Sequence, residues 1–373
     1  MKILELTNYS AGGCGVWVRV KQEAELLAER GHEVKVFSSN ITKGSKIKAP
    51  QTEMLGKVEI IRFPAIKLGG ESFLNWKFKE EALKFKPDII FAHMYRHLHT
   101  TKALKLAEQI KCKIFLVTHA PFARDESRSS LAKNIVSFYD NFIGPNSLRK
   151  FDKVIAITRW EMPHLTRLGL PKEKIKYIPN GIPAKFFSAL QKEKEENKIL
   201  FFGRISPIKN IEVVIRAIHS IKDKKIVLEI AGPAEADYLK KLEKIISEKN
   251  LNKRVIFSNA IYSLQKKISK FDSAKIYTLP SKSEGMPQTL IEAMARGKIV
   301  IASDNPGSKD IINDGKNGFL FKNNDEKELG KKLNDILEMK KRDLKKIKLN
   351  ARKTAEEFSC DRIIVKIEEL IKE

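Results

Sequence analysis

Cysteine is scarce in this chain: Cys14, Cys112 and Cys360 are the three cysteines among 373 residues. They are far apart in the sequence and match neither a metal-binding spacing nor a redox pair. This scarcity excludes a cysteine-based metal or redox motif. A reduced, cytoplasmic setting is the expectation that follows.

Long apolar runs are lacking as well. No run approaches the roughly 20 residues that cross a bilayer. The opening segment, MKILELTNYS, is too short and too polar for a signal peptide. We therefore expect a soluble cytoplasmic protein, with association at the inner face of the membrane as an alternative.

Acidic residues are outnumbered, with 46 Asp and Glu against 71 Lys and Arg, for a net charge of +25. The excess is shared: residues 1–190 carry 32 cations against 18 anions, and residues 191–373 carry 39 against 28. Three interpretations compete, namely a solvated lysine-rich surface, an anionic membrane surface and nucleic acid. We favour the solvated surface, and nucleic acid is not expected because no recognised binding module is present.

Two segments are candidates for a binding surface. Residues 327–353 are densely basic, but their apolar residues recur at helical spacing, which favours a packed surface helix over a membrane anchor. Phe73, Trp76 and Phe78 alternate with lysines and could form a lipid-facing or acceptor-facing edge. An ordinary helix that packs these aromatics inward is the favoured interpretation.

A convincing set of metal ligands is also missing. His93, His97, His99 and His119 fall in one region, and His93 and His97 are spaced for one face of a helix. No cysteine or carboxylate completes a convincing set. We therefore expect no metal and no cofactor.

Apolar runs that resemble strands alternate with amphipathic helical stretches along the whole chain. The runs are residues 2–6, 34–37, 89–91, 114–117 and 154–157, then 199–202, 227–230, 255–257, 276–279 and 299–302. Such alternation predicts an α/β fold with parallel sheets flanked by helices. The polar segment at residues 190–198 separates the two series and is the best linker candidate.

The most informative segment is LPSKSEGMPQTLIEAMARGKIV at residues 279–300. It predicts a strand, a loop that carries Glu284, and a helix with Pro287 in its first turn, Glu292 near its middle and Gly297 just past its end. A helix start suits a phosphate, whereas carboxylates beside it suit sugar hydroxyls. Two solvated glutamates on an ordinary strand–turn–helix unit are the alternative.

A second segment, ILFFGRISPIKN at residues 199–210, adds cations. An apolar strand ends at Gly203 and is followed by Arg204, Lys209 and a helix start. Arg204 can bind a phosphate through two hydrogen bonds and Lys209 can act as a point charge, which is a sensible pyrophosphate clamp. Exposed loop cations without such a role are the alternative.

Together, GRISPIKN at residues 203–210 and EGMPQTLIEAMARG at residues 284–297 resemble the retaining glycosyltransferases of family 4. Gly12 and Gly13, followed by a helix and LLAERGHEVKVFS, are similar to the opening of that family, and IPNGI at residues 178–182 to its PNG turn. The resemblance covers nearly the whole chain. It implies the GT-B fold, in which two Rossmann-like domains face each other across a cleft. The expected domains are residues 1–188 for the acceptor, residues 189–358 for the nucleotide sugar, and a C-terminal helix at 359–373 that packs back on the first domain.

The resemblance also implies roles. Arg204 and Lys209 would hold the donor diphosphate and stabilise the departing nucleotide, and Glu292 would bind the ribose hydroxyls. Glu284 would bind hydroxyls of the donor sugar, and His119 would lie close to that sugar. The remaining donor-binding residues implied are Gly12, Gly13, Gly203, Gly285, Met286 and Pro287, and the implied catalytic set is Glu284, His119, Arg204 and Lys209.

Some residues depart from the family pattern. Ala120 follows His119 where a polar or acidic residue is common. The loop at residues 305–310 has the single glycine Gly307 where two are usual, and Asp310 where glutamate is common. These differences bear on the role of His119 and on the fit around Asp310, but not on the diphosphate clamp.

The predicted activity is transfer of a hexose-type sugar, with retention, from a nucleotide-diphosphate sugar to a hydroxyl of a glycan, lipid-linked or small-molecule acceptor. No Asp-x-Asp motif occurs in the chain, so cations and a helix start would replace a metal at the diphosphate. The alternative is a non-catalytic relative that binds nucleotide sugars or glycans. An NAD-dependent enzyme is disfavoured, because the residues from Gly12 to Gly15 do not have the G-x-G-x-x-G spacing.

Overall fold

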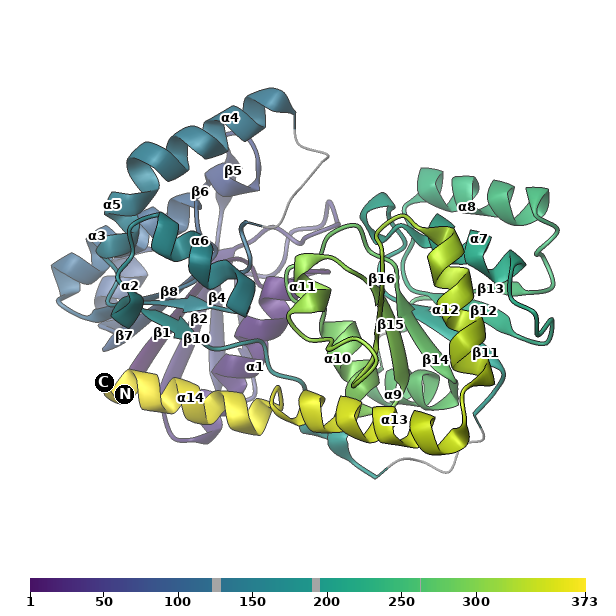
Figure 1. The fold of residues 1–373 in the computed structure, drawn as a ribbon. Coiled ribbons are helices and arrows are strands. Elements are labelled where there is room, and N and C mark those ends of the chain that lie inside the picture. Colours follow the sequence, from purple (N-terminus) through teal and green to yellow (C-terminus); the bar gives the residue numbers. More distant parts are fainter. Residues whose placement is uncertain (123–128, 190–194, 262) are drawn as a thin grey trace. The chain divides into compact units, whose positions relative to one another are not determined.

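The computed structural model describes residues 1–122, 129–189, 195–261 and 263–373 (Figure 1). The chain forms two compact units. The first unit comprises Met1–Gly181 together with Cys360–Glu373, and the second comprises Ile182–Ser359. Each unit is an α/β unit with its own sheet, as predicted from the alternation of apolar runs and helical patterns.

The sheet of the first unit has eight strands among the described residues, in the order β10-β9-β8-β7-β1-β2-β4-β3. All its ladders are parallel except the β3–β4 pair. Its strands are β1 (Lys2–Tyr9), β2 (Glu33–Ser39), β3 (Thr52–Leu55), β4 (Val58–Phe63), β7 (Ile89–His93), β8 (Lys113–Val117), β9 (Lys153–Ala156) and β10 (Ile175–Tyr177). Strands β1 and β7 are buried almost throughout, which explains their continuous apolar runs.

Helices cover both faces of this sheet, and a small hairpin stands apart from it. The helices are α1 (Gly15–Glu29), α2 (Lys79–Phe85), α3 (Leu98–Ile110), α4 (Ser130–Phe138), α5 (Gly144–Arg149), α6 (Met162–Arg167) and α14 (Cys360–Lys372), with a π-helical segment, η2 (Tyr139–Ile143), between α4 and α5. Strands β5 (Ala65–Lys67) and β6 (Leu74–Trp76) form the hairpin. Short 3₁₀ turns occur at Glu71–Phe73, Arg159–Glu161 and Lys172–Lys174.

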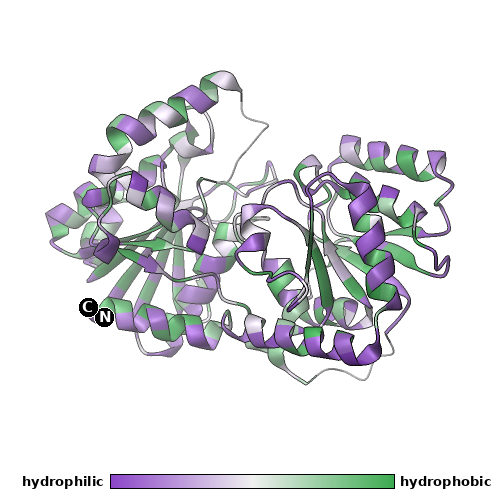
Figure 2. Ribbon diagram, viewed as in Figure 1, coloured by the Kyte–Doolittle hydropathy of each residue, from purple (hydrophilic) through white to green (hydrophobic). Residues whose placement is uncertain are grey.

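The second unit has a fully parallel six-stranded sheet among its described residues, in the order β13-β12-β11-β14-β15-β16. Its strands are β11 (Lys198–Phe202), β12 (Val227–Ala231), β13 (Val255–Ser258), β14 (Ile276–Leu279), β15 (Ile299–Ser303) and β16 (Phe319–Phe321). Its helices are α7 (Ile211–His219), α8 (Ala236–Glu248), α9 (Leu264–Ser273), α10 (Gln288–Ala295), α11 (Pro306–Lys309), α12 (Glu326–Glu338) and α13 (Lys341–Glu356). 3₁₀ turns lie at Ala184–Phe187 and Pro207–Lys209. Figure 2 shows the strands as largely hydrophobic, consistent with burial on both faces.

Strand order reverses once in each sheet. In the first unit β1 lies between β2 and β7, and in the second unit β11 lies between β12 and β14. In open α/β sheets, ligands bind at such a switch point, outside the carboxyl ends of the strands. The loops after β1, β7 and β8, and those after β11 and β14, are therefore where sites are expected.

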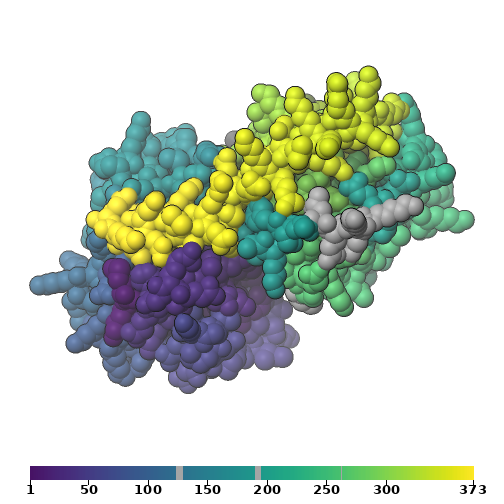
Figure 3. All heavy atoms as spheres, turned by 90° about the horizontal axis from the view of Figure 1, so that it is seen from below, coloured from purple at the N-terminus to yellow at the C-terminus, as the bar shows by residue number. Residues whose placement is uncertain are grey.

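The chain leaves the first unit at Gly181, earlier than the predicted boundary between residues 188 and 189. The turn Ala184–Phe187 belongs to the second unit because Phe186 is fully buried in that unit's core. Of the predicted linker, residues 190–194 lie outside the described residues, and Lys198 begins β11. The C-terminal helix α14 belongs to the first unit and packs against α1 (Figure 3).

The basic segment at residues 327–353 forms parts of two helices, α12 and α13, rather than one. Leu333, Ile336 and Ile347 are buried in the core of the second unit. The expectation that this segment packs against the core is therefore confirmed, although it forms two helices. Of the three aromatics proposed as an edge, Trp76 and Phe78 are buried and Phe73 is exposed. No helix of the described residues is both long and apolar enough to cross a membrane.

One buried ion pair fixes the start of the second unit. Arg296, which caps the end of α10, donates to both carboxylate oxygens of Asp272 on α9, each at 2.7 Å. Its guanidinium also donates to the carbonyls of Phe186 and Ser188 at 3.1 and 3.0 Å. Arg296 is completely buried. Its hydrogen bonds therefore join the end of α10 to α9 and to the segment at residues 186–188.

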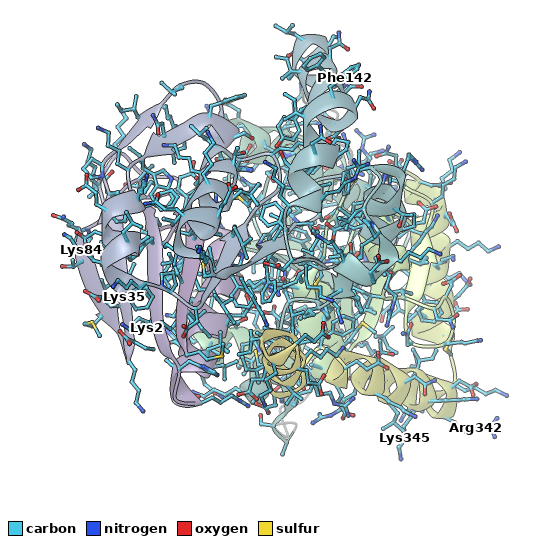
Figure 4. The ribbon with its side chains drawn as sticks, turned by 90° about the vertical axis from the view of Figure 1, so that its left-hand side faces the viewer. Lys2, Lys35, Lys84, Phe142, Arg342 and Lys345 are labelled. Carbon is cyan, nitrogen blue, oxygen red and sulfur yellow. The ribbon has the colours of Figure 1, made fainter. Side chains whose placement is uncertain are left out.

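Replacing Arg296 by Ala is therefore expected to destabilise the second unit by about 3–5 kcal/mol, because Asp272 would keep a buried charge without its partner. Chemical unfolding followed by circular dichroism measures the loss. Arg342→Ala is the matched control, since Arg342 is 92% exposed on α13 (Figure 4). An equal effect of the two substitutions would contradict this account.

Candidate active site

In the second unit, the residues of the two predicted motifs meet at the carboxyl ends of neighbouring strands. Strands β11 and β14 pair directly, and the loops that leave them are joined by a hydrogen bond from the Lys282 N–H to the Ile208 carbonyl at 2.9 Å. Lys209 ends the first loop and Glu284 lies in the second. The ammonium of Lys209 is 2.6 Å from Oε1 of Glu284, so the tertiary structure brings together residues that are 75 positions apart.

The other predicted cation is placed differently. Arg204 directly follows Gly203 at the end of β11, but its side chain is 62% exposed and lies 3.9 Å from Glu235. The Lys209 side chain is 21% exposed, and its carboxylate partner is 12% exposed. Lys209 is thus held in the site by an ion pair, whereas Arg204 extends into solvent beside it.

Glu292 lies near the middle of α10 and is almost fully buried. The ammonium of Lys267, on α9, is 2.6 Å from its carboxylate and lies over the rings of Phe186 and Phe202 at 5.6 and 5.2 Å. Burial raises the pKa of Glu292, and the charge of Lys267 opposes that rise. Sequence reasoning missed Lys267, because nothing in the pattern of α9 marks it as facing another helix.

The loop before α10 is tightly packed. The helix begins at Gln288, with Pro287 at the N-cap rather than in the first turn, and Gly297 has a φ of 61° just past its end. The segment at residues 305–310, expected as a loop, contains the short helix α11 with Asn305 as its cap. A Cβ on Gly307 would lie 2.7 Å from the carbonyl oxygen of Glu284. Glycine there lets α11 support the loop that carries Glu284, Gly285 and Met286.

In the first unit, Gly12 and Gly13 lie in the loop between β1 and α1. Gly12 has a φ of 83°, and a Cβ there would come within 2.2 Å of the carbonyl oxygen of Lys43. Gly13 has open space where its Cβ would be. The pair therefore has two roles: Gly12 allows a close approach of two loops, and Gly13 leaves room at the start of α1.

His119 follows β8 in a strained turn. His119 and Ala120 both have left-handed backbones, with φ of 60° and 54°, a conformation that costs on the order of 1–3 kcal/mol for each non-glycine residue. The fully buried carboxylate of Glu161 holds this turn, accepting from the Thr118 hydroxyl at 2.6 Å and from the Ala120 N–H at 2.8 Å. Its other oxygen accepts from the N–H groups of Ile157 and Thr158. Sequence reasoning missed Glu161, which lies 42 positions after His119 and outside every motif quoted.

The expectation that His93 and His97 share a helix face is wrong. His93 ends β7, whereas His97 is the N-cap of α3. Left-handed residues at Met94 and Arg96 turn the chain between them. The helical spacing was coincidental, because both histidines precede the first residue of α3, Leu98.

Carboxylates do stand beside His93, contrary to the sequence-based expectation. Glu5, Glu23 and His93 are all buried and offer ligand atoms within 4.8 Å of one another. Arg19 donates to both oxygens of Glu23, at 2.8 and 2.9 Å. The group is therefore organised by an ion pair and hydrogen bonds among protein side chains.

Comparisons with known proteins identify glycosyltransferases as relatives of this chain. A family model described as Glycosyltransferase Family 4 matches residues 13–186, and one described as Glycosyl transferases group 1 matches residues 184–354. An uncharacterized glycosyltransferase of Methanocaldococcus jannaschii is 27% identical over 335 residues, which cover 84% of this chain and 83% of that protein.

Solved structures share the fold over the whole chain. HepE of Anabaena in complex with UDP has a TM-score of 0.79 at 20% identity and is covered completely, as is this chain. Sucrose-phosphate synthase from Thermosynechococcus elongatus has a TM-score of 0.79 at 19% identity, covering 100% of this chain and 98% of that one. The two family models together span nearly the whole chain, which therefore belongs to the family 4 glycosyltransferases and is a glycosyltransferase of the GT-B type.

Proposed function

We propose that this glycosyltransferase moves a hexose-type sugar, with retention and without a metal ion, from a nucleotide-diphosphate sugar to a hydroxyl of its acceptor. The observation that carries the proposal is the ion pair between Lys209 and Glu284 at the carboxyl ends of β11 and β14. A cation suited to a diphosphate and a carboxylate suited to sugar hydroxyls meet there at 2.6 Å. HepE, which has this fold, was solved with UDP.

Without a donor, Lys209 and Glu284 neutralise each other. A donor diphosphate would accept hydrogen bonds from Lys209 and Arg204, and the sugar hydroxyls would donate to the carboxylate of Glu284. Lys209 would thus exchange one anionic partner, Glu284, for another, the diphosphate, whereas Glu284 would exchange its ammonium partner for neutral hydroxyl donors. Glu292, held by Lys267, would accept from the ribose hydroxyls, with the backbone of Gly285, Met286 and Pro287 between the two carboxylates.

Departure of the nucleotide builds negative charge on the leaving phosphate oxygens. Preorganised cations are most effective where charge develops, and such electrostatic stabilisation is usually the largest single contribution to catalysis. Lys209 and Arg204 are the cations for this step. Retention would follow from attack of the acceptor on the same face as the leaving phosphate, which takes the acceptor's proton. A covalent glycosyl-enzyme on Glu284 would contradict this mechanism.

A non-catalytic relative that binds nucleotide sugars or glycans is the alternative. Such a protein would keep the binding contacts of Glu292 and Glu284 without turning over a donor. Binding and turnover measured on the same preparation separate the two functions. The acceptor is proposed as a glycan, a lipid-linked sugar or a small molecule with a free hydroxyl.

We also propose contact with an anionic membrane surface, through α4 and the π-helical segment η2 after it. No described residue of α4 is buried. Leu131, Ile135, Phe138 and Phe142 recur at helical spacing and are 70%, 51%, 58% and 66% exposed. Figure 4 shows Phe142 on a helix that projects from the first unit. An exposed apolar stripe on a chain of net charge +25 suits an anionic lipid surface.

The residues near this stripe carry positive charge, which contact with an anionic surface requires. Lys133, Arg149 and Lys150 belong to the same helical segment and its end, and Asp140 is paired with Arg96. The sequence did not single out this segment, since its aromatics have the spacing of any amphipathic helix. The support comes from burial, because none of the described residues of α4 is buried.

Donor binding is tested by calorimetry with UDP, GDP and ADP, without metal and again with magnesium. One nucleotide is expected to bind equally in both conditions. Lys209→Ala and Glu292→Ala should each weaken it by about 10- to 100-fold, because a hydrogen bond to a charged group is lost. Lys222→Ala is the matched control, since Lys222 forms a surface ion pair with Glu338 in the same unit.

Turnover of the matching sugar nucleotide, with the anomeric configuration of the product read by NMR, then tests transfer and retention. Binding without turnover of any donor would favour the non-catalytic alternative. A strict magnesium requirement would contradict the metal-free clamp, and no binding of any nucleotide would overturn the proposal.

Membrane contact is tested by co-sedimentation with vesicles of phosphatidylglycerol or of phosphatidylcholine. We expect binding to the anionic vesicles and a clear loss in Phe138→Ser/Phe142→Ser, because the exposed aromatic pair would no longer enter the interface. Ile256→Ser, at an apolar side chain 50% exposed on β13, is the control. Equal sedimentation of the double variant and the unaltered protein would rule out this helix as the contact.

A further inference from the structure

Three side chains from neighbouring strands of the first unit form a continuous hydrogen-bonded chain. Glu5 lies on β1, His93 ends β7 and His119 follows β8, and these strands are adjacent in the sheet. Oε2 of Glu5 is 2.6 Å from Nε2 of His93, and Nδ1 of His93 is 2.9 Å from Nε2 of His119. Glu5 and His93 are fully buried, whereas His119 is only partly buried. The chain thus leads from the core toward the surface.

The protonation of Glu5 decides the direction of these bonds. The charge of Arg19 acts on Glu5, but its guanidinium donates to both oxygens of Glu23, to the Ile178 carbonyl at 2.9 Å and to Asn180 Oδ1 at 3.0 Å. Glu5 therefore sits in the core beside the carboxylate of Glu23, whose cation is already engaged. Burial, reinforced by Glu23, raises the pKa of Glu5 well above its usual value. A neutral acid is the form that this environment favours.

The neighbouring histidines are neutral for the same reason. Burial lowers the pKa of His93 to about 3, and burial together with His93, Arg19 and His97 holds the pKa of His119 well below its usual value. A neutral imidazole carries one proton, so the nitrogen that accepts a hydrogen bond forces the proton onto the other.

The proton positions follow in sequence. The O–H of neutral Glu5 donates to Nε2 of His93, which places the proton of His93 on Nδ1. That N–H donates to Nε2 of His119, which places the proton of His119 on Nδ1. The turn held by Glu161 fixes the backbone of His119 at the same time.

We propose that Glu5 and His93 are positioning residues that hold His119 as its Nδ1–H tautomer, so that His119 donates a hydrogen bond to an oxygen of the sugar substrate. This inference rests on the proposed function and on the role that the family resemblance implies for His119. An N–H that donates to a hydroxyl oxygen discriminates against a sugar that lacks that oxygen, because such a sugar would shield the donor from water and leave it unpaired.

The tautomer can be read without any substrate. In protein labelled with ¹⁵N-histidine, two-bond ¹H–¹⁵N correlations distinguish Nδ1–H from Nε2–H imidazoles. We expect Nδ1–H for both His93 and His119 at neutral pH. An Nε2–H form of His119 in the unaltered protein would overturn the proposal, whatever the variants do.

Two substitutions test the role of Glu5. Glu5→Gln keeps an N–H donor for His93 and should preserve both tautomers and activity. Glu5→Leu removes the donor, and should give mixed tautomers and a loss of about 10- to 100-fold in kcat/KM, mainly in kcat, by analogy with the loss of residues that orient a functional histidine. Thr7→Val is the matched control, because Thr7 is fully buried on the same face of β1 and its hydroxyl has no hydrogen-bond partner among the described residues.

The outcomes separate this inference from the proposed function. If no sugar nucleotide binds or turns over, the proposed function fails, and the NMR spectrum still decides the tautomer. If Glu5→Leu does not fold, the unaltered protein and Glu5→Gln decide it. Unchanged kcat/KM in a folded Glu5→Leu variant, or an equal loss in Thr7→Val, would show that Glu5 does not act through His119.

Discussion

Strands that pair in parallel must each be entered from the same edge of the sheet, so the chain has to cross back over a face before it can pair again. In both units this constraint gathers the loops after β1, β7 and β8, and those after β11 and β14, at the carboxyl ends of adjacent strands. Residues far apart in the sequence become neighbours there. Lys209 and Glu284 meet in this way, and so do Glu5, His93 and His119.

Buried carboxylates then acquire different properties from their different partners. Glu23 is paired with Arg19 through two hydrogen bonds, and Glu161 accepts a set of hydrogen bonds from backbone and hydroxyl donors. Glu292 has Lys267. Glu5 is hydrogen-bonded to a histidine and forms no ion pair with a lysine or arginine of the described residues, so burial favours its neutral form. Glutamate therefore has four roles here: Glu23 forms an ion pair, Glu161 holds the backbone of a turn, Glu292 is a candidate ribose contact, and Glu5 is the inferred hydrogen-bond donor.

The two units also differ in the interactions that hold their candidate functional side chains in position. In the second unit, the ammonium groups of Lys209 and Lys267 are paired with carboxylates. Under the proposed function, these carboxylates would accept hydrogen bonds from substrate hydroxyls. In the first unit, His119 is held by a strained turn and by a buried chain of hydrogen bonds. Under the proposed function, the ion pairs of the second unit would exchange partners when a donor binds, whereas the hydrogen bonds around His119 in the first unit form without a ligand.

Sequence alone was sufficient for the α/β architecture, for the strand and helix around Glu284 and Glu292, and for the family, because apolar periodicity and short motifs are local properties of the chain. It was not sufficient for Lys267, Glu161 or Glu5, each of which acts on a residue from another element. The helical spacing of His93 and His97 was misleading for the same reason, since the turn at Met94 and Arg96 depends on its surroundings. Local pattern determined which elements form. Packing decided which charges are buried together, because burial and pairing depend on side chains that only the folded sheet brings within a few ångströms.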